Sequence, residues 1–330
     1  MDHMVKTILI ISYAEDQHVP FVTRHLDKAK VPWALLETNR LGKSSSISIS
    51  VSADADRVCL LASGLEIDLS NIGSIWNRRR VVNPMTASID LSSSLMHQYI
   101  KEQHLALLDN AFSFSQVYWI NRQLALRSAR PKMLQLFRAK EVGLNIPRTL
   151  CSDSPKSVRK FVSTCNNTIT KVVTPGTPLT ADVSNQYMIY TQRFPTDVIS
   201  DESISAAPAI YQEEIEKEYE ARAIIINNKI LTCRIDSQAS SKTALDWRHY
   251  DFGNVAHSPI ELPADISERL IKLTKGFGLV FSAVDLCFSK KGDWIFFELN
   301  ANGQWAWLEE MAGLPIGMTL AAELTKGVYR

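Results

Sequence analysis

Apolar residues follow strand patterns in some segments of this chain and helical spacing in others. The change between the two patterns marks where strands and helices are expected. Residues 6–13 and 33–37 are short apolar runs typical of buried parallel strands, and residues 21–30 between them have helical spacing. This order predicts a β-α-β unit. Residues 41–69 instead alternate serine with isoleucine and valine, which predicts antiparallel strands joined by turns.

Later segments with helical spacing carry recognisable start and stop signals. Pro131 and Pro155 each stand where a first helical turn is expected, and Gly143 follows the last apolar residue of its segment. Helices are therefore predicted at residues 92–112, 131–142, 153–165, 264–277 and 315–327, the last amphipathic and packed on a sheet.

Between these helices lie runs rich in β-branched and aromatic residues. Asn227-Asn228 and Lys291-Gly292 each separate two such runs, which predicts β-hairpins. Further strands are expected at 72–80, 168–173 and 209–215. Because helices and strands alternate early and hairpins dominate later, the sequence predicts an α/β class with additional antiparallel (α+β) lobes.

Composition narrows the class of protein. A chain of 330 residues with 45% hydrophobic residues fits two or three packed domains. With 36 basic and 35 acidic residues it has no strong overall field, so we expect no nucleic acid or membrane partner. The five cysteines form no Cys-x-x-Cys pair, which argues against zinc and disulfides and favours a reducing cytoplasm. No glycine-rich dinucleotide fingerprint follows the first strand.

The second hairpin carries the clearest candidate chemistry. If Lys291 and Gly292 form its turn, counting outward sets Asp285 opposite Glu298, and strand alternation puts Asn300 on the same face. Directly opposed residues hold their Cβ atoms about 4.5–5.5 Å apart, so the two carboxylates could share a cation. Mg²⁺ bridged to a nucleotide phosphate fits such a donor set. The alternative is an ordinary hairpin with a solvated polar face, and a register shift of one residue would undo the site.

Other charged residues allow two interpretations each. Lys171 lies on a strand before the turn-rich residues 174–178, where a lysine can neutralise phosphates under a covering loop. Lys132 could equally be a plain first-turn helix lysine, and Glu220 and Arg222 could pair across their hairpin. The run Arg78-Arg79-Arg80 is either a solvated surface or an anion or peptide contact at a domain junction. Trp247, Trp305 and Trp307 are interpreted as core aromatics.

Taken together, these positions resemble the ATP-grasp ligases, and among them the microviridin-type peptide ligases, or graspetide synthetases. The resemblance covers nearly the whole chain. Its most specific motifs are Glu298-Leu299-Asn300-x-x-Gly303-Gln304-Trp305-x-Trp307, Asp236-Ser237-Gln238 ahead of Asp246-Trp247-Arg248, and Trp76-x-Arg78-Arg79.

The resemblance implies a fold and a division of labour. It implies an ATP-grasp fold in which an N-terminal α/β pre-ATP-grasp domain (1–120) precedes a central lobe (121–200) and a C-terminal lobe (201–330), the two lobes clamping ATP. The implied roles are phosphate binding by Lys132 and Lys171, adenine contacts by the backbone of Glu213, Glu214 and Ile215, ribose binding by Glu220, Mg²⁺ binding by Asp285, Glu298 and Asn300, and charge stabilisation by Arg222 and Arg248.

The implied activity is ADP-forming peptide macrocyclisation through an acyl phosphate. Side-chain carboxylates of a ribosomally synthesised precursor peptide with an N-terminal leader would be joined to Ser/Thr hydroxyls (ω-ester) or Lys amines (ω-amide). Two alternatives stay open: a ligase that adds an amino acid to a peptide or protein terminus, and a non-catalytic ATP-binding peptide scaffold. A homodimer is also left open.

Overall fold

The N-terminal part of the chain is a parallel sheet with the predicted β-α-β start. The computed structural model describes residues 5–82, 94–113, 115–174, 190–196, 198–249, 251 and 253–329. Its first sheet has the strand order β2-β1-β6-β7, with bounds β1 (Thr7–Ser12), β2 (Trp33–Glu37), β6 (Ile72–Asn77) and β7 (Tyr118–Ile120). Helix α1 (His18–Lys28) links β1 to β2. The apolar run of β1 is fully buried, as a parallel strand covered on both faces requires.

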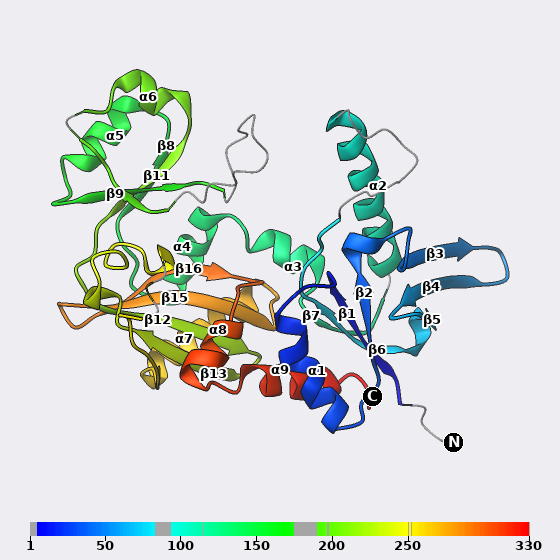
Figure 1. Ribbon diagram of the computed structural model, residues 1–330. Helices are drawn as coiled ribbons and strands as arrows, with labels where there is room; N and C mark the ends of the chain where they lie inside the picture. The colour runs from blue at the N-terminus through cyan, green and yellow to red at the C-terminus, as the bar shows by residue number, and fades with distance from the viewer. Residues whose placement is uncertain are drawn as a thin grey trace.

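The serine-alternating segment forms a separate antiparallel sheet, as predicted. It contains β3 (Ser46–Val51), β4 (Asp56–Ala62) and β5 (Leu65–Asp68), with the short 3₁₀ turns η1 (Thr38–Arg40) and η2 (Leu69–Asn71) on either side. Helix α2 (Ser94–Ser113) packs its C-terminal half here, burying Leu108 and Phe112. Leu95 and Tyr99, in the first half of α2, are instead 78% and 58% exposed. The first half of α2 stands away from the sheet (Figure 1).

A small antiparallel sheet forms a lobe of its own, drawn in green in Figure 1. Its order is β10-β9-β11-β8, with bounds β8 (Thr149–Ser152), β9 (Thr168–Val172), β10 (Gln192–Arg193) and β11 (Ala209–Glu213). Helices α5 (Pro155–Val162) and α6 (Asp201–Ala206) bury their apolar residues against it. Ser154 caps α5 by accepting a hydrogen bond from the Ser157 N–H. The predicted phosphate-covering loop at 174–178 lies, from residue 175 onward, outside the described residues.

The largest sheet is antiparallel and carries the candidate metal hairpin. Its order is β14-β13-β12-β15-β16, with bounds β12 (Lys217–Ile226), β13 (Lys229–Ile235), β14 (His257–Ile260), β15 (Phe281–Ser289) and β16 (Trp294–Asn300). Helices α4 (Lys132–Glu141) and α7 (Ala264–Gly276) cover one face. The connections include α3 (Gln123–Ser128), η3 (Ser237–Ala239) and η4 (Trp247–His249).

The other face of this sheet meets the N-terminal domain through the last helices, α8 (Ala306–Ala312) and α9 (Ile316–Thr325). Helix α9, red in Figure 1, runs beside α1. Any side chain at Gly317 would collide with the Phe21 carbonyl oxygen, 2.1 Å from where its Cβ would lie. The prediction of an amphipathic α9 was wrong: it lies between two sheets and buries residues on most of its circumference. No described helix is both long enough and apolar enough to cross a membrane.

Candidate active site

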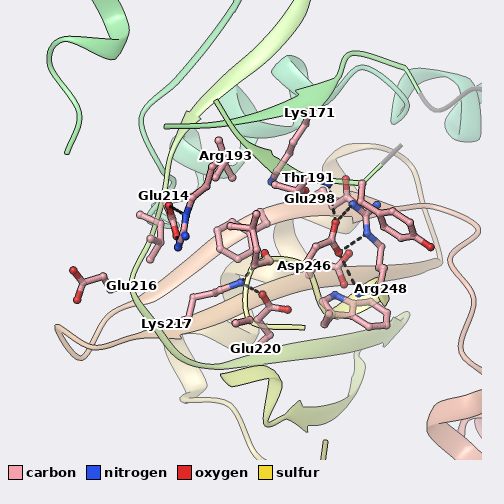
Figure 2. Close-up of a pocket in the computed structure, with 18 of the residues that line it drawn as sticks. Lys171, Thr191, Arg193, Glu214, Glu216, Lys217, Glu220, Asp246, Arg248 and Glu298 are labelled. Atoms are coloured by element: carbon pink, nitrogen blue, oxygen red, sulfur yellow. Dashed lines mark hydrogen bonds and ion pairs between the residues drawn. The ribbon is translucent and has the colours of Figure 1, made fainter. Parts of the chain in front are cut away.

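A cavity of about 1010 Å³ lies between the green lobe and the large sheet. Its walls come from β9, β10, the 213–217 connection, the start of β12, the 238–248 loop and the β15–β16 hairpin. Figure 2 shows Lys171 entering from one sheet while Lys217 and Glu220 enter from the other. The predicted site residues that line it are Lys132, Lys171, Glu213, Glu214, Ile215, Glu220, Arg248, Asp285 and Glu298.

Asp285 and Glu298 are opposite each other, but a bulge puts them there. Near the turn, Phe288 pairs with Trp294 and Leu286 pairs with Phe296. This register differs by one residue from the register predicted for a turn at Lys291-Gly292. The register then shifts, so that Phe297 has no partner and Asp285 faces Glu298. The predicted pair was therefore correct, whereas the predicted pairing at the turn was wrong. Without the bulge Asp285 would face Phe297.

Asn300 joins the two carboxylates, as strand alternation predicted. Its Nδ2 atom lies 3.0 Å from Glu298 Oε1 and 3.3 Å from Asp285 Oδ2. Two carboxylates and one amide suit Mg²⁺, which usually keeps several water and phosphate ligands. Within the described ranges, no group of three or more His, Cys, Asp or Glu side chains could hold a metal. Two carboxylates and one amide would leave the other positions on a hard cation to water or to a bound ligand.

The two carboxylates are held in different charge environments. Burial raises the pKa of Asp285 to about 6, although the Arg222 guanidinium opposes this shift. Burial also acts on Glu298, but the Lys132 charge and the Asn300 hydrogen bond outweigh it and lower its pKa to about 2. Adjacent acids in unlike surroundings separate in this way because both cannot readily carry charge without a cation.

Two lysines from different elements converge on the same region. Lys132, at the start of α4, places Nζ 3.6 Å from Glu298 Oε2 and 3.5 Å from the Val172 carbonyl oxygen. Lys171, on β9, donates to Gln212 Oε1 at 2.9 Å. Burial and the nearby Lys132 charge lower the pKa of Lys171 to about 8. Buried ammonium groups that are only partly compensated are suited to binding an anion.

The connection expected to meet adenine has most of its donors in use. The Glu213 N–H donates to the Arg148 carbonyl oxygen at 2.9 Å, and the Glu214 N–H donates to the Asn167 carbonyl oxygen at 3.0 Å. The Glu214 carboxylate also pairs with Arg193 at 2.8 Å. The backbone groups left for a base are therefore carbonyl oxygens and the Ile215 N–H.

Glu220 lies on the cavity floor with one unsatisfied oxygen. Its Oε1 pairs with Lys217, a residue that the sequence analysis did not single out, while its buried Oε2 has no hydrogen-bond partner. Burial raises the pKa of Glu220 to about 7. A buried acceptor at a cavity wall without a partner is suited to a ligand hydroxyl. Only a lysine three residues before Glu220 could have suggested this pair from sequence.

The two predicted arginines lie in different places. Arg248 lines the cavity. Its side chain donates two hydrogen bonds to Asp246, from Nε to Oδ1 at 2.8 Å and from Nη2 to Oδ2 at 2.5 Å (Figure 2). Despite burial, the bonds from Arg248 hold the pKa of Asp246 well below its usual range. Arg222 is not among the cavity residues: it is buried behind Asp285 and donates to Oδ1 at 2.6 Å.

The tryptophans are only partly core residues. Trp305 is fully buried, as expected. Trp247 and Trp307 are partly buried against the same core, with ring centroids 5.1 Å apart, and Trp247 also lines the cavity. The Arg78-Arg79-Arg80 run is divided: Arg79 is exposed, Arg80 pairs with Asp109 at 2.6 Å, and Arg78 is buried at the junction between the N-terminal domain and the large sheet.

Two buried amides that sequence reasoning missed hold the site in place. Gln135 on α4 brackets Leu299, accepting from its N–H at 2.9 Å and donating to its carbonyl oxygen at 2.8 Å. Asn121, after β7, accepts from the Phe281 N–H at 3.0 Å and donates to the Ala301 carbonyl oxygen at 3.0 Å. A single Gln in a helix or Asn after a strand carries no sequence signal of such a role.

Comparison with known proteins relates this geometry to a family of folds. Residues 7–127 match the family model of the MvdD pre-ATP grasp domain. No curated protein matches the chain in sequence. Several solved structures match nearly all of it. A Chryseobacterium gregarium RiPP-associated ATP-grasp ligase, in complex with ADP and a leader and core peptide, matches with TM-score 0.88 and 21% identity over 97% of both chains.

Two further structures agree. The macrocyclase MdnC from Microcystis aeruginosa MRC, bound with precursor peptide MdnA, has TM-score 0.84 and 24% identity over 97% of this chain and 99% of its own. The ATP-grasp ligase PsnB, complexed with a variant of minimal precursor, Mg and ADP, has TM-score 0.75 and 20% identity over 98% of both chains. At such identities the likeness establishes the fold. Residues 7–127 are thus similar to the MvdD pre-ATP-grasp domain, and the whole chain has the ATP-grasp fold of these solved structures, as the resemblance predicted.

Proposed function

We propose that this chain is an ADP-forming ATP-grasp ligase that cyclises a ribosomally synthesised precursor peptide. The observation that carries the proposal is one cavity lined by Lys132, Lys171 and the two carboxylates Asp285 and Glu298, with Asn300 hydrogen-bonded to both carboxylates. The same fold, matched over 97% of both chains, is that of a ligase described with ADP, leader and core peptide.

The chain's residues fit the groups that such a ligase binds. ATP supplies the phosphoryl group that activates a carboxylate as an acyl phosphate, and Mg²⁺ offsets the charge of its phosphates. Asp285, Glu298 and Asn300 are proposed to hold Mg²⁺, and Lys132 and Lys171 to hold phosphate oxygens. Glu220 is proposed to accept from the ribose, and the backbone at Glu213, Glu214 and Ile215 to meet the adenine.

Arg248 is the residue proposed to stabilise charge during transfer. Its side chain is 37% exposed at the cavity, and its planar fork already holds a carboxylate, that of Asp246, with two bonds. This geometry suits a substrate carboxylate or an acyl phosphate. Arg222 reaches Asp285 rather than the cavity, so its proposed contribution is to hold that carboxylate.

We also propose the domain limits of the chain, its cellular location and its partners. We place the domain limits at 1–120, 121–200 and 201–330, and the protein in the cytoplasm without nucleic acid or membrane partners. The peptide is proposed to bind through an N-terminal leader as well as its core, which raises the effective concentration of the core at the cavity. A homodimer is compatible with this arrangement.

The test is to incubate the protein with ATP, Mg²⁺ and the peptide encoded by a neighbouring short reading frame rich in Thr, Asp and Glu. We expect the peptide to lose the mass of one water per new bond while ADP and phosphate form. Release of AMP and pyrophosphate would contradict the chemistry. Addition of an amino-acid mass would indicate a terminal amino-acid ligase, and ATP binding without turnover a scaffold.

A further inference from the structure

The turn that follows Asn300, residues 301–305, is held by three side chains from the N-terminal part of the chain. Each bond reaches a backbone atom of the turn: Asn121 Nδ2 to the Ala301 carbonyl oxygen at 3.0 Å, Arg78 Nη1 to the Asn302 carbonyl oxygen at 2.8 Å, and the Trp305 N–H to His18 Nε2 at 3.1 Å. The donor and acceptor side chains are all buried.

The remaining residues of this turn are fixed from the sheet side. The Gly303 N–H donates to the Asn300 carbonyl oxygen at 3.1 Å. A Cβ at Gly303 would lie 2.5 Å from both Ala283 Cβ and Arg222 Nη2, so no larger residue fits. Arg222 Nη2 also donates to the Gln304 carbonyl oxygen at 3.2 Å. A displacement of the turn would therefore move the backbone of Asn300 directly.

Arg78 is itself set rigidly. Its side chain is 2% exposed, with Nε 3.4 Å from Asp16 Oδ2 and Nη2 3.1 Å from His18 Nδ1. Asp16 in turn accepts from Ser12 Oγ at 2.6 Å and from the His18 N–H at 3.0 Å. We call Asp16, His18 and Arg78 the junction cluster. A buried arginine needs one carboxylate to offset its charge, and Asp16 provides it. The bond to Asn302 is additional to that pairing and crosses the domain junction.

We propose that Arg78 is a positioning residue for the metal trio: from the N-terminal domain it fixes the 301–305 turn and thereby the place of Asn300 beside Asp285 and Glu298. The inference rests on the proposed function, because it assumes that the trio binds Mg²⁺. In this inference, Arg78 of the Trp76-x-Arg78-Arg79 motif contacts the protein's own backbone rather than peptide or phosphate. Residues that orient metal ligands without touching the metal commonly contribute about 10- to 100-fold in metal affinity.

The experiment measures Mn²⁺ binding by electron paramagnetic resonance, with a non-hydrolysable ATP analogue present, on the full chain. In Arg78→Lys, which keeps the charge beside Asp16 but loses the fork, we expect Mn²⁺ affinity to fall about tenfold. Analogue affinity without metal should stay within about twofold, since Lys132 and Lys171 are untouched. Arg79→Lys, the exposed neighbour, is the matched control and should bind Mn²⁺ like the wild type.

A second variant guards against a folding defect. Asp16→Asn combined with Arg78→Gln removes both buried charges together, which is tolerated better than removing one. It should show the same loss of Mn²⁺ affinity while circular dichroism and melting remain those of a folded chain. Wild-type Mn²⁺ affinity in the folded Arg78 variants, or an equal loss in Arg79→Lys, would overturn the inference alone. Failure of the wild type to bind Mn²⁺ with the analogue would instead overturn the proposed metal site.

Discussion

Two buried charge clusters lie within one molecule, and they are built differently. The cavity cluster of Lys132, Asp285 and Glu298 sets two carboxylates opposite each other, with pKa values near 6 for Asp285 and near 2 for Glu298. The junction cluster has a single carboxylate, Asp16, whose pKa is lowered despite burial by bonds from His18 and by the Arg78 charge.

The difference indicates what each cluster is for. At the junction the charges compensate one another inside the protein, so the cluster stabilises one arrangement of the domains. In the cavity, repulsion between the acids and the incomplete pairing of Lys132 and Lys171 would be relieved by the proposed ligand, which carries both a cation and phosphates. Variants of the junction cluster, whose charges compensate one another, should therefore mainly lose stability. Variants of the cavity cluster should mainly lose ligand binding and catalysis.

The largest effect is expected from Glu298→Gln in the cavity cluster. The variant keeps the shape of the side chain but loses the charge that holds the cation, so peptide-dependent ATP hydrolysis should fall by about 10³-fold or more. Because Lys132 and the Asn300 hydrogen bond lower the pKa of Glu298 to about 2, its charged form stabilises the fold, and the melting temperature at pH 7 should fall as well. Turnover near the wild-type rate would remove Glu298 from the metal site.

Asp285→Asn, the second change in the cavity cluster, should lose both activity and stability. Arg222 lies 2.6 Å from Asp285 Oδ1 and would be left buried without its carboxylate. Removing one partner of a buried pair costs about 3–5 kcal/mol. Thermal unfolding checks this: an Asp285→Asn variant that melts at the wild-type temperature would contradict the pairing of Arg222 with Asp285.

The junction cluster should respond to Asp16→Asn by losing stability. The change leaves Arg78 buried without a carboxylate, at a cost of about 3–5 kcal/mol at pH 7. Since the pKa of Asp16 is lowered in the folded state, its contribution is complete above the unfolded value of about 4 and is lost as the pH falls below it. The difference in stability between wild type and variant should therefore be constant from pH 7 to about pH 4 and should begin to narrow at pH 3. A gap that widens toward low pH would show the sign to be wrong.

Arg248→Lys tests whether the fork at the cavity acts on the substrate. An ammonium keeps the charge but not the two-point geometry, so cyclisation should slow by about 10²-fold while ATP affinity stays nearly intact. The competing account is that Arg248 only braces Asp246, with which it makes both of its bonds here. Near-normal cyclisation with a lowered melting temperature would support that account.

The smallest effect concerns the pH dependence of nucleotide binding. Burial lowers the pKa of Lys171 to about 8, so its charge is present below pH 8 and is lost above it. ATP affinity should be about tenfold weaker at pH 9 than at pH 7. Lys171→Arg, which stays charged, should abolish the decline. The same decline in Lys171→Arg would assign it to another group.

The sequence by itself determined most elements and much of the candidate site. Continuous apolar runs predicted β1 and β2, the turn residues Asn227-Asn228 between two such runs predicted the β12–β13 hairpin, and helical spacing predicted α4. Strand alternation alone placed Asn300 beside Glu298. Asp285 was paired with Glu298 from a turn register that is off by one residue, and the bulge compensates for that difference. Sequence could not reveal the bulge at Phe297, because an inserted residue is set by packing on neighbouring strands and leaves no local pattern.

Tertiary structure decided the contacts between segments far apart in the chain. It buried Arg78, moved Arg222 behind Asp285, paired Glu220 with Lys217, and set Asn121 and Gln135 against β15 and β16. A local window predicts whether a residue is buried on its own helix or strand, but the partner of a buried polar group lies on another segment. The charge of each such residue could be read from the sequence, whereas its role depended on a partner up to 224 residues away, as in the bond from Arg78 to Asn302.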